Sequence, residues 1–364
     1  MIDKSSSCGR IPKGQYSIFT EEKIVTRARN QLISLDATPY YHCISRCVRR
    51  AFLWGEDSLT GKNYEHRKEW VVSRLGTLAE VFAIDICAYA IMSNHYHLVL
   101  RVDRQRAETW STRQVIKQWK KLHKLPRFVA RYLWAEAVSQ GERVEVKKIV
   151  EVWRARLGDI SWFMRSLNEH LARRANGEDR CSGRFWEGRF KSQALLDEAA
   201  VLTCMSYVDL NPVRAGIAAT PEESDFTSIQ QRIRQQGLRN VKSERATSKL
   251  QPIPLMALVK PSQDLHENVI GFSQVDYLEL VDWAGRAIRK DKHGAIAEEA
   301  PPILQRIGLD RGRYLEHQGG VAETEKPTML GHMERLREVA GALGRRFING
   351  FGEAQRLYRP LRAG

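Results

Sequence analysis

The sequence predicts an α+β fold built on one antiparallel sheet. Segments of alternating, β-rich residues at 40–47, 86–102 and 183–196 are separated by segments whose apolar residues recur at helical spacing. Hydrophobic residues make up 43% of the 364-residue chain, which is enough for a sizeable core. No stretch approaches the roughly 18 uncharged apolar residues of a membrane span, so we expect no membrane partner.

The elements follow one another in a recognisable order. Residues 40–47 form the first strand, and residues 64–82 form an amphipathic helix. In 86–102, two apolar runs flank a Ser-Asn turn, which predicts a β-hairpin. A second helix over 158–176 precedes the strand at 183–196. This β-α-β-β-α-β order predicts the ferredoxin-like, split βαβ arrangement.

Composition divides the chain into a core domain at 39–218 and three flanking parts. Residues 1–38 are polar and predict an N-terminal arm. Residues 219–253 are rich in Gln, Ser and Arg and predict a linker, and 254–364 predict a helical C-terminal accessory region. An additional helix over about 198–211 completes the core domain.

The chain is strongly basic, with a net charge of +15 that suits a polyanionic partner such as nucleic acid. Residues 104–157 carry fourteen Lys and Arg against five acids, with four tryptophans between them, and they interrupt the fold as a helical insertion. Basic side chains beside aromatic rings favour nucleic-acid contacts. The alternative is a solvated helical pair whose tryptophans pack on the domain.

Two histidines, His95 and His97, begin the second strand of the hairpin. Side chains alternate along a strand, so both imidazoles point to one face and can reach one ion. Tyr207 and Asn211 lie on adjacent turns of the later helix, which Pro212 ends. Each residue also has a structural interpretation: buried histidines at a strand start, a packing tyrosine and a C-capping asparagine.

Together these residues offer two nitrogens, an amide oxygen and a phenol. Such a set suits Mg²⁺ or Mn²⁺ when phosphate supplies further oxygens. The ion can polarise a phosphodiester, and the phenol can then act as a nucleophile.

Three motifs carry a resemblance to a known family. Met92–Val99 looks like the His-hydrophobic-His strand of the single-tyrosine HUH transposases, whose acronym denotes that motif. Tyr207–Gly216 resembles the tyrosine-helix signature of the REP-associated tyrosine transposases, and Arg184–Ser192 resembles the strand before it. Tyr41–Arg46 also fits the start of that family, so the resemblance covers about residues 37–217.

The resemblance implies metal-dependent cleavage and joining of single-stranded DNA at hairpins of repetitive extragenic palindromes (REP). Tyr207 would form a 5′-phosphotyrosine and leave a free 3′-hydroxyl. His95 and His97 would bind Mg²⁺ or Mn²⁺, with Asn211 in the place where a glutamine often stands. The insertion and the tail beyond residue 220 depart from the minimal family pattern.

Basic residues near the tyrosine helix are candidates for contacts with DNA. We expect phosphate contacts from the charged ones, with ordinary surface charge as the alternative. The aromatic one can stack on a base or pack in the core. These candidates are Arg46, Arg49, Arg184, Trp186, Arg189 and Lys191.

Two other functions fit the same residues. One is a hairpin-binding protein that does not transfer strands, and the other is a metal-dependent nuclease that uses water. The six cysteines lack metal-ligand spacing and suit a reduced, cytoplasmic, nucleoid-associated protein. We expect a monomer rather than a homodimer, because the tyrosine helix closely follows its own strand.

Overall fold

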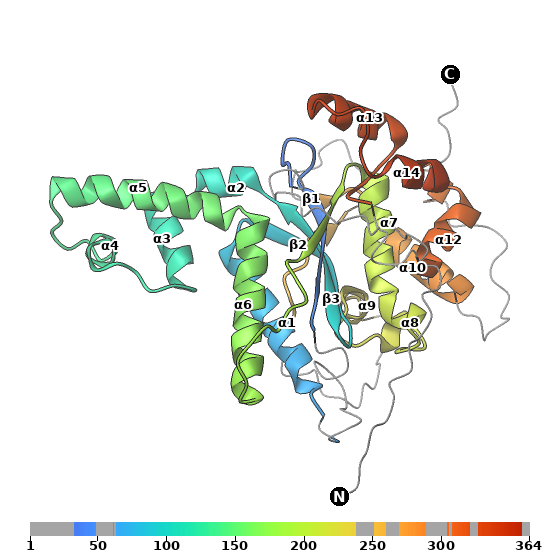
Figure 1. The fold of residues 1–364 in the computed structure, drawn as a ribbon, viewed down its shortest axis with the longest axis horizontal. Helices are drawn as coiled ribbons and strands as arrows, with labels where there is room; N and C mark the ends of the chain where they lie inside the picture. Colours follow the sequence, from blue (N-terminus) through green and yellow to red (C-terminus); the bar gives the residue numbers. More distant parts are fainter. Residues whose placement is uncertain are drawn as a thin grey trace, which may run out of the picture.

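The computed structural model describes residues 33–48, 61, 63–237, 251–259, 269–288, 304–305, 308–320 and 327–358. Most of the predicted N-terminal arm, together with Arg49, lies outside the described residues. The fold is α+β, with helices on both sides of a mixed five-stranded sheet of order β2-β3-β1-β4-β7 (Figure 1). Its strands are β1 (Tyr40–Arg46), β2 (Ile84–Ile91), β3 (His95–Val102), β4 (Lys191–Leu195) and β7 (Met329–Leu330).

Strand β1 is central and pairs antiparallel with β3 and β4. The purely antiparallel sheet predicted from the sequence is wrong at one edge, because β7 pairs parallel to β4. The amide of Leu196 donates to the Leu330 carbonyl at 2.8 Å, and that of Ala194 donates to the Thr328 carbonyl at 2.9 Å. A two-residue strand from the end of the chain therefore covers the edge that β4 would otherwise expose.

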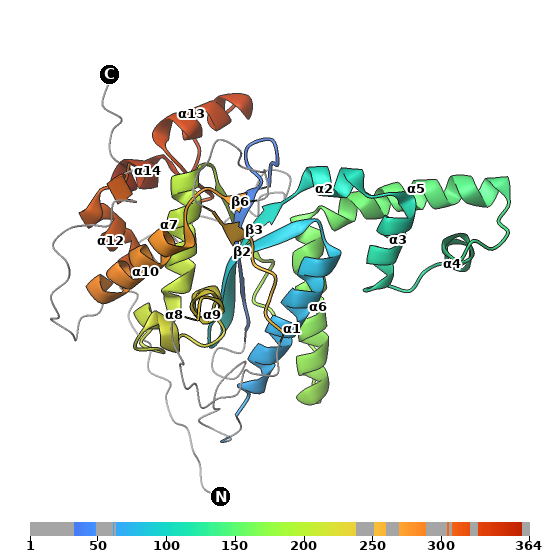
Figure 2. The same ribbon diagram turned by 180° about the vertical axis from the view of Figure 1, so that it is seen from behind.

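Helices α1 (His66–Val81) and α6 (Ile160–Glu178) cover one face of the sheet (Figure 2). Asp159 caps α6 by accepting from the Trp162 amide at 2.8 Å. The buried guanidinium of Arg67 donates to Glu178 at 2.6 Å and also pairs with Asp179. These ion pairs fix the start of α1 to the end of α6.

Helix α7 (Glu198–Asp209) lies on the opposite face of the sheet from α6, and α8 (Asn211–Arg214) follows it (Figures 1 and 2). Asp197 caps α7 by accepting from the Ala200 amide at 2.8 Å. The helix predicted over about 198–211 is α7, which ends two residues earlier at Asp209, and Asn211 and Pro212 instead begin α8. Proline has no amide proton to donate and is tolerated there.

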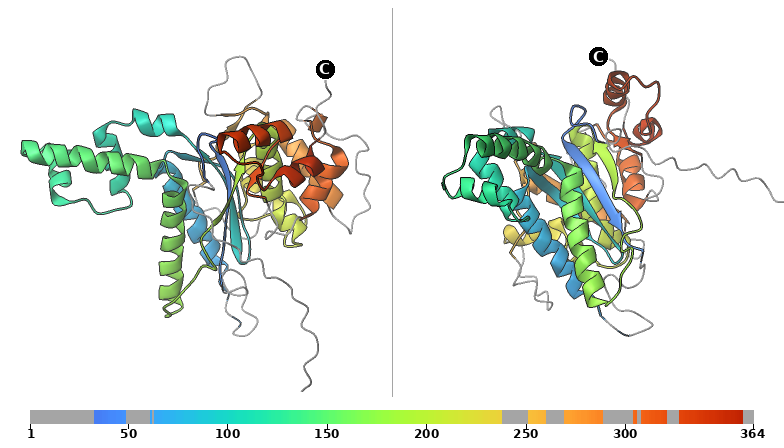
Figure 3. Two further views of the ribbon diagram at one scale, coloured as in Figure 1. Left: turned by 45° about the horizontal axis from the view of Figure 1, so that its top comes forward. Right: turned by 60° about the vertical axis from the view of Figure 1, so that its left-hand side comes forward.

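The insertion extends away from the sheet as a helical arm (Figure 3). Its longest helix, α5 (Gln140–Leu157), packs against α3 (Thr112–Lys120) through Trp153 and Trp119, whose ring centroids are 5.1 Å apart in a stacked arrangement. Trp134 remains 64% exposed. The arm comprises α2 (Arg104–Thr109), α3 (Thr112–Lys120), α4 (Arg127–Leu133) and α5 (Gln140–Leu157).

The range predicted as a linker is folded over 219–237, where it contains η2 (Pro221–Glu223) and α9 (Ser228–Gln235). The physical reason is a set of buried polar contacts with β2. The Tyr89 amide donates to Ser228 Oγ at 2.8 Å, and buried Arg232 donates to the Cys87 carbonyl at 3.0 Å.

The described part of the C-terminal region is mostly helical. None of the helices in the described ranges combines the length and apolar character that a membrane crossing needs. Besides β7, the region contains the two-stranded pair β5 (Ala257–Leu258) and β6 (Val269–Ile270), and the helices α10 (Gln274–Ile288), α12 (Arg311–Gly320), α13 (Met333–Ala342) and α14 (Phe351–Leu357).

Candidate active site

Two neighbouring strands place three imidazoles on one face of the sheet. His95 and His97 share this face of β3, with ring centroids 4.9 Å apart, and His97 is fully buried. His42 on β1 lies diagonally across, because His97 is paired with Ile44. His42 Nε2 and His97 Nδ1 are 2.9 Å apart and share a hydrogen bond. This bond fixes the orientation of the His97 ring.

Helices α7 and α8 bring the tyrosine and the asparagine to the same imidazole. The Tyr207 ring centroid is 6.0 Å from that of His97 and 6.4 Å from that of His42. Asn211 donates from Nδ2 to His97 Nε2 at 2.8 Å. The structure thus brings Tyr207, Asn211 and His97 into one cluster, beside His95.

A guanidinium completes the surroundings of the phenol. Arg214, on α8, holds its guanidinium carbon 4.0 Å from the centroid of the Tyr207 ring. Its Nη1 atom is buried and has no hydrogen-bond acceptor among the described residues. A buried guanidinium nitrogen with that donor capacity can bind an anion such as phosphate.

Asp209 fixes the helix between the tyrosine and the asparagine. Its fully buried carboxylate accepts hydrogen bonds from Ser228 Oγ at 2.5 Å, from the Ile229 amide at 3.0 Å and from the Tyr277 hydroxyl at 2.5 Å. Burial raises the pKa of Asp209 to about 6. These bonds tie the last turn of α7 to α9 and α10.

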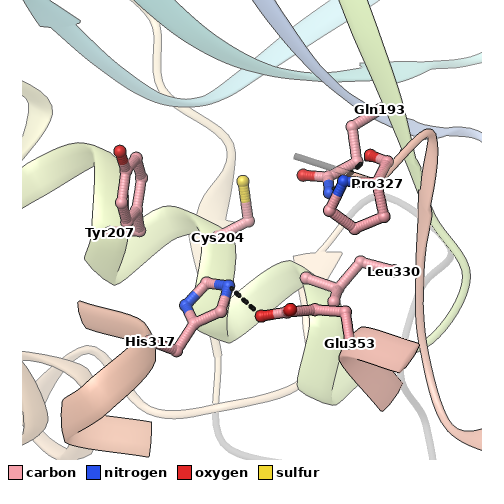
Figure 4. A pocket seen from close by; sticks show the side chains of 7 residues that line it. All are labelled: Gln193, Cys204, Tyr207, His317, Pro327, Leu330 and Glu353. Atoms are coloured by element: carbon pink, nitrogen blue, oxygen red, sulfur yellow. Dashed lines mark hydrogen bonds and ion pairs between the residues drawn. The ribbon is translucent and has the colours of Figure 1, made fainter. Parts of the chain in front are cut away.

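The C-terminal region covers one side of Tyr207. The ring is only 2% exposed and borders a cavity of about 10 Å³, roughly the space of one water molecule. His317 of α12 lies with its ring centroid 6.0 Å from that of Tyr207, and its Nε2 is 3.6 Å from a carboxylate oxygen of Glu353. Figure 4 shows the Tyr207 hydroxyl at the end of the ring farthest from His317.

The site has part of the geometry that a divalent ion needs. In the described part of the chain, no group of three His, Cys, Asp or Glu residues converges to hold a metal ion. However, His97 Nε2 and the Asn211 amide meet at 2.8 Å. Rotating the Asn211 amide by 180° would present its oxygen to the same imidazole. Asn211 and His97 are thus in direct contact, and the ring of His95 lies beside that of His97.

The candidate DNA-contacting residues surround the far end of β1. Arg184, Arg189 and Lys191 are exposed, and Arg46 is half-buried. Trp186 donates from Nε1 to the Asn168 carbonyl at 2.9 Å and packs edge-on against Tyr96. In this structure Trp186 packs against the domain, which is the alternative to stacking on a base.

Three residues near the phenol were missed in the sequence analysis. His42 could have been found from the sequence, because it lies on the predicted first strand, where alternation places one side chain in two on each face of the sheet. Arg214 follows the tyrosine by seven residues, which is two helical turns. His317 lies far along the chain, and no spacing connects it to Tyr207.

Comparisons with known proteins add a distant structural likeness. No protein-family model and no curated protein matches this chain. A solved structure of a REP-associated tyrosine transposase bound to a REP hairpin is similar at 12% identity and a TM-score of 0.31, over 63% of this chain and 92% of that chain.

Proposed function

We propose that this protein is a single-tyrosine DNA transposase that cleaves and rejoins single-stranded DNA at hairpin sequences. The observation that carries the proposal is the convergence of the Tyr207 phenol, the His97 imidazole and the Asn211 amide on one face of the sheet. The strand order β2-β3-β1-β4, with α1 and α6 on the other face, supports the split βαβ scaffold expected of such an enzyme.

Tyr207 acts as the nucleophile. Its phenolic oxygen attacks the phosphorus of a phosphodiester, forms a 5′-phosphotyrosine and releases a 3′-hydroxyl; rejoining reverses these bonds. Arg214 would hold the phosphate that Tyr207 attacks, a role supported by its guanidinium carbon lying 4.0 Å from the ring centroid. The phenolic proton passes to water on cleavage and returns to Tyr207 on rejoining, while His42 and His97 flank the ring with centroids 6.4 and 6.0 Å away.

His95, His97 and Asn211 would hold Mg²⁺ or Mn²⁺. When bound, such an ion offsets negative charge on the phosphate oxygens. His42 acts as a positioning residue through its 2.9 Å hydrogen bond to His97. Around this site, Arg46, Arg184, Arg189 and Lys191 contact the DNA backbone. We propose a cytoplasmic, nucleoid-associated monomer.

The test is a covalent adduct. The protein is incubated with 5′- or 3′-labelled, hairpin-bearing single-stranded DNA and Mg²⁺ or Mn²⁺, and the products are separated on a denaturing gel. We expect an adduct with the native chain and none with Tyr207→Phe or with a chelator. Tyr132→Phe, in the insertion, is the matched control and keeps the adduct.

The 2% exposure of Tyr207 favours one second candidate, a hairpin-binding protein without strand transfer. Hairpin binding without any cleavage by the native chain would establish that function instead. Cleavage that persists in Tyr207→Phe would overturn both and indicate a nuclease that uses water.

A further inference from the structure

A basic groove lies on the side of the sheet opposite Tyr207. It is formed by α1, α3 and α6 and has a volume of about 760 Å³. Helices α6 and α7 lie on opposite faces of the sheet, so the groove is separated from the tyrosine by the sheet itself (Figures 1 and 2). The lining residues that carry charge or rings are Arg74, Trp119, His123, Trp162, Arg165, Glu169, His170, Arg173 and Arg174.

The α6 wall of the groove is a continuous stripe. Trp162, Arg165, Glu169 and Arg173 recur every three or four residues, so they share one face of the helix beside its core stripe. The lining contains four arginines and one acid. That acid, Glu169, lies within ion-pair distance of both Arg165 and Arg173, which are 64% and 79% exposed. A net positive charge therefore faces the solvent.

Stacked rings form the opposite wall. Trp119 stacks on Trp153 at 5.1 Å and on His123 at 4.2 Å, and His123 and Trp119 line the groove. Burial, with the charge of Arg74 and Arg156 added, lowers the pKa of His123 and so favours its uncharged form. A neutral ring at the end of a stack suits a nucleic-acid base.

These features together have the chemistry of a single-strand binder. Guanidinium groups attract phosphates, and aromatic rings stack on bases that no complementary strand covers. A duplex offers only its phosphates to such a wall, because its bases are already stacked on one another. A protein partner would need acidic side chains and would gain little from the rings.

A line of contacts connects the groove to the candidate active site. Arg46 is paired with His95, and its carbonyl accepts from the Glu187 amide at 2.9 Å. In the same loop, Trp186 donates to the carbonyl of Asn168, which precedes Glu169 of the groove. The loop that carries these basic residues therefore contacts β1 next to His95 and α6 next to Glu169.

We propose that the groove binds the single-stranded DNA that continues beyond the hairpin. This inference rests on the proposed function, since it assigns the groove to the flank of the same substrate. The insertion contributes α3 and the stacked rings, so it acts as a second DNA-binding element.

The experiment compares a bare hairpin with the same hairpin carrying a single-stranded extension, by fluorescence anisotropy over a range of salt concentrations. The double variant Arg165→Gln/Arg173→Gln is expected to bind the extended DNA about 10-fold more weakly, with a salt slope lower by about 1.4, as two lost phosphate contacts require. Binding of the bare hairpin changes less than about 2-fold.

The control is Arg337→Gln/Arg346→Gln, which removes two exposed charges from the C-terminal region, outside both the groove and the insertion. It should leave both affinities unchanged. Photo-crosslinking of 5-iodouracil in the extension should label the Trp119–His123 peptide. Equal weakening by both double variants, or crosslinks confined to other peptides, would overturn the inference.

The outcomes separate this inference from the proposed function. Adduct formation on the hairpin without any gain in affinity from the extension overturns the groove alone. A gain in affinity that depends on Arg165 and Arg173, without an adduct, supports the groove and overturns the transposase chemistry. Absence of DNA binding overturns both.

Discussion

The insertion and the C-terminal region are both additions to the sheet, yet they attach to it in different ways. The insertion is anchored where the Ala83 amide donates to the Leu157 carbonyl at 2.9 Å and where Gln118 Nε2 donates to the Glu80 carbonyl at 2.9 Å, and the rest of it extends outward (Figure 3). The C-terminal region folds back onto α7. Ser206 Oγ and the Tyr314 hydroxyl share a buried hydrogen bond of 2.6 Å, and Gln318 donates to the Thr203 carbonyl at 3.1 Å.

The difference indicates different tasks for the two additions. Buried hydrogen bonds are directional and costly to leave unmade, so they fix one arrangement of the tyrosine helix. The insertion leaves charged side chains in solvent, where they can attract a polyanion. One addition therefore positions the candidate nucleophile, while the other presents charge.

The largest loss of stability should follow removal of Asp209, whose buried carboxylate joins α7 to α9 and α10. Asp209→Ala leaves the Ser228 hydroxyl, the Ile229 amide and the Tyr277 hydroxyl without their acceptor. We expect the free energy of unfolding to fall by about 3 kcal/mol in urea denaturation. Asp282→Ala, which breaks only a surface pair with Arg286, should change it by less than about 0.5 kcal/mol.

The carboxyl group of Asp209 also makes the free energy of unfolding fall as the pH rises. Its pKa is raised from 3.8 to about 6, so the folded state binds this proton more tightly than the unfolded chain. The stabilisation is present below about pH 4 and is lost as the pH rises through 6, by up to about 3 kcal/mol. Asp209→Asn should flatten this part of the stability curve. An identical curve for both proteins would contradict the assignment.

An intermediate effect is expected where β7 meets the start of α14. A Cβ on Gly350 would overlap the Met329 carbonyl oxygen and would lie 3.2 Å from Leu336 Cδ2. Gly350→Ala should cost about 2 kcal/mol and increase hydrogen exchange at the β4–β7 amides. Gly352→Ala has open space and a helical position, so it should be neutral or stabilising by up to about 1 kcal/mol.

The smallest effect should be local to the insertion. Ser139 Oγ accepts from the Glu142 amide at 3.2 Å, and the Glu142 carboxylate accepts from the Ser139 amide at 2.8 Å, which forms a capping box on α5. Ser139→Ala should lower the stability of α5 by about 1 kcal/mol in hydrogen exchange. The global unfolding midpoint should stay unchanged, as it should in Gln140→Ala. A global shift would mean that the arm is coupled to the sheet.

Periodicity in the sequence predicted the elements that make up the sheet and its helices. The hairpin, both helices on one face and the tyrosine helix are long, and their apolar residues repeat at clear intervals. The same alternation predicted that His95 and His97 would share a face. The proline at position 212 predicted that the tyrosine helix ends at about Asn211, two residues after the observed end of α7.

Features that depend on distant contacts were not predictable in this way. Strand β7 has two residues, too few to show a pattern, and its partner lies more than a hundred positions earlier. Helix α9 could not be recognised from its polar sequence, because it is stabilised by buried hydrogen bonds of Arg232 and Ser228 to β2. The cover over Tyr207 depends on His317, which only the tertiary structure brings near.

The parallel pairing of β7 with β4 also constrains how the chain is synthesised. The outer edge of β4 cannot be covered by β7 until Met329 and Leu330 have left the ribosome. Until then, a nascent chain carries an open sheet edge, a feature that invites pairing with other chains. Translation of the last part of the chain therefore completes the sheet and the surroundings of Tyr207 at the same time.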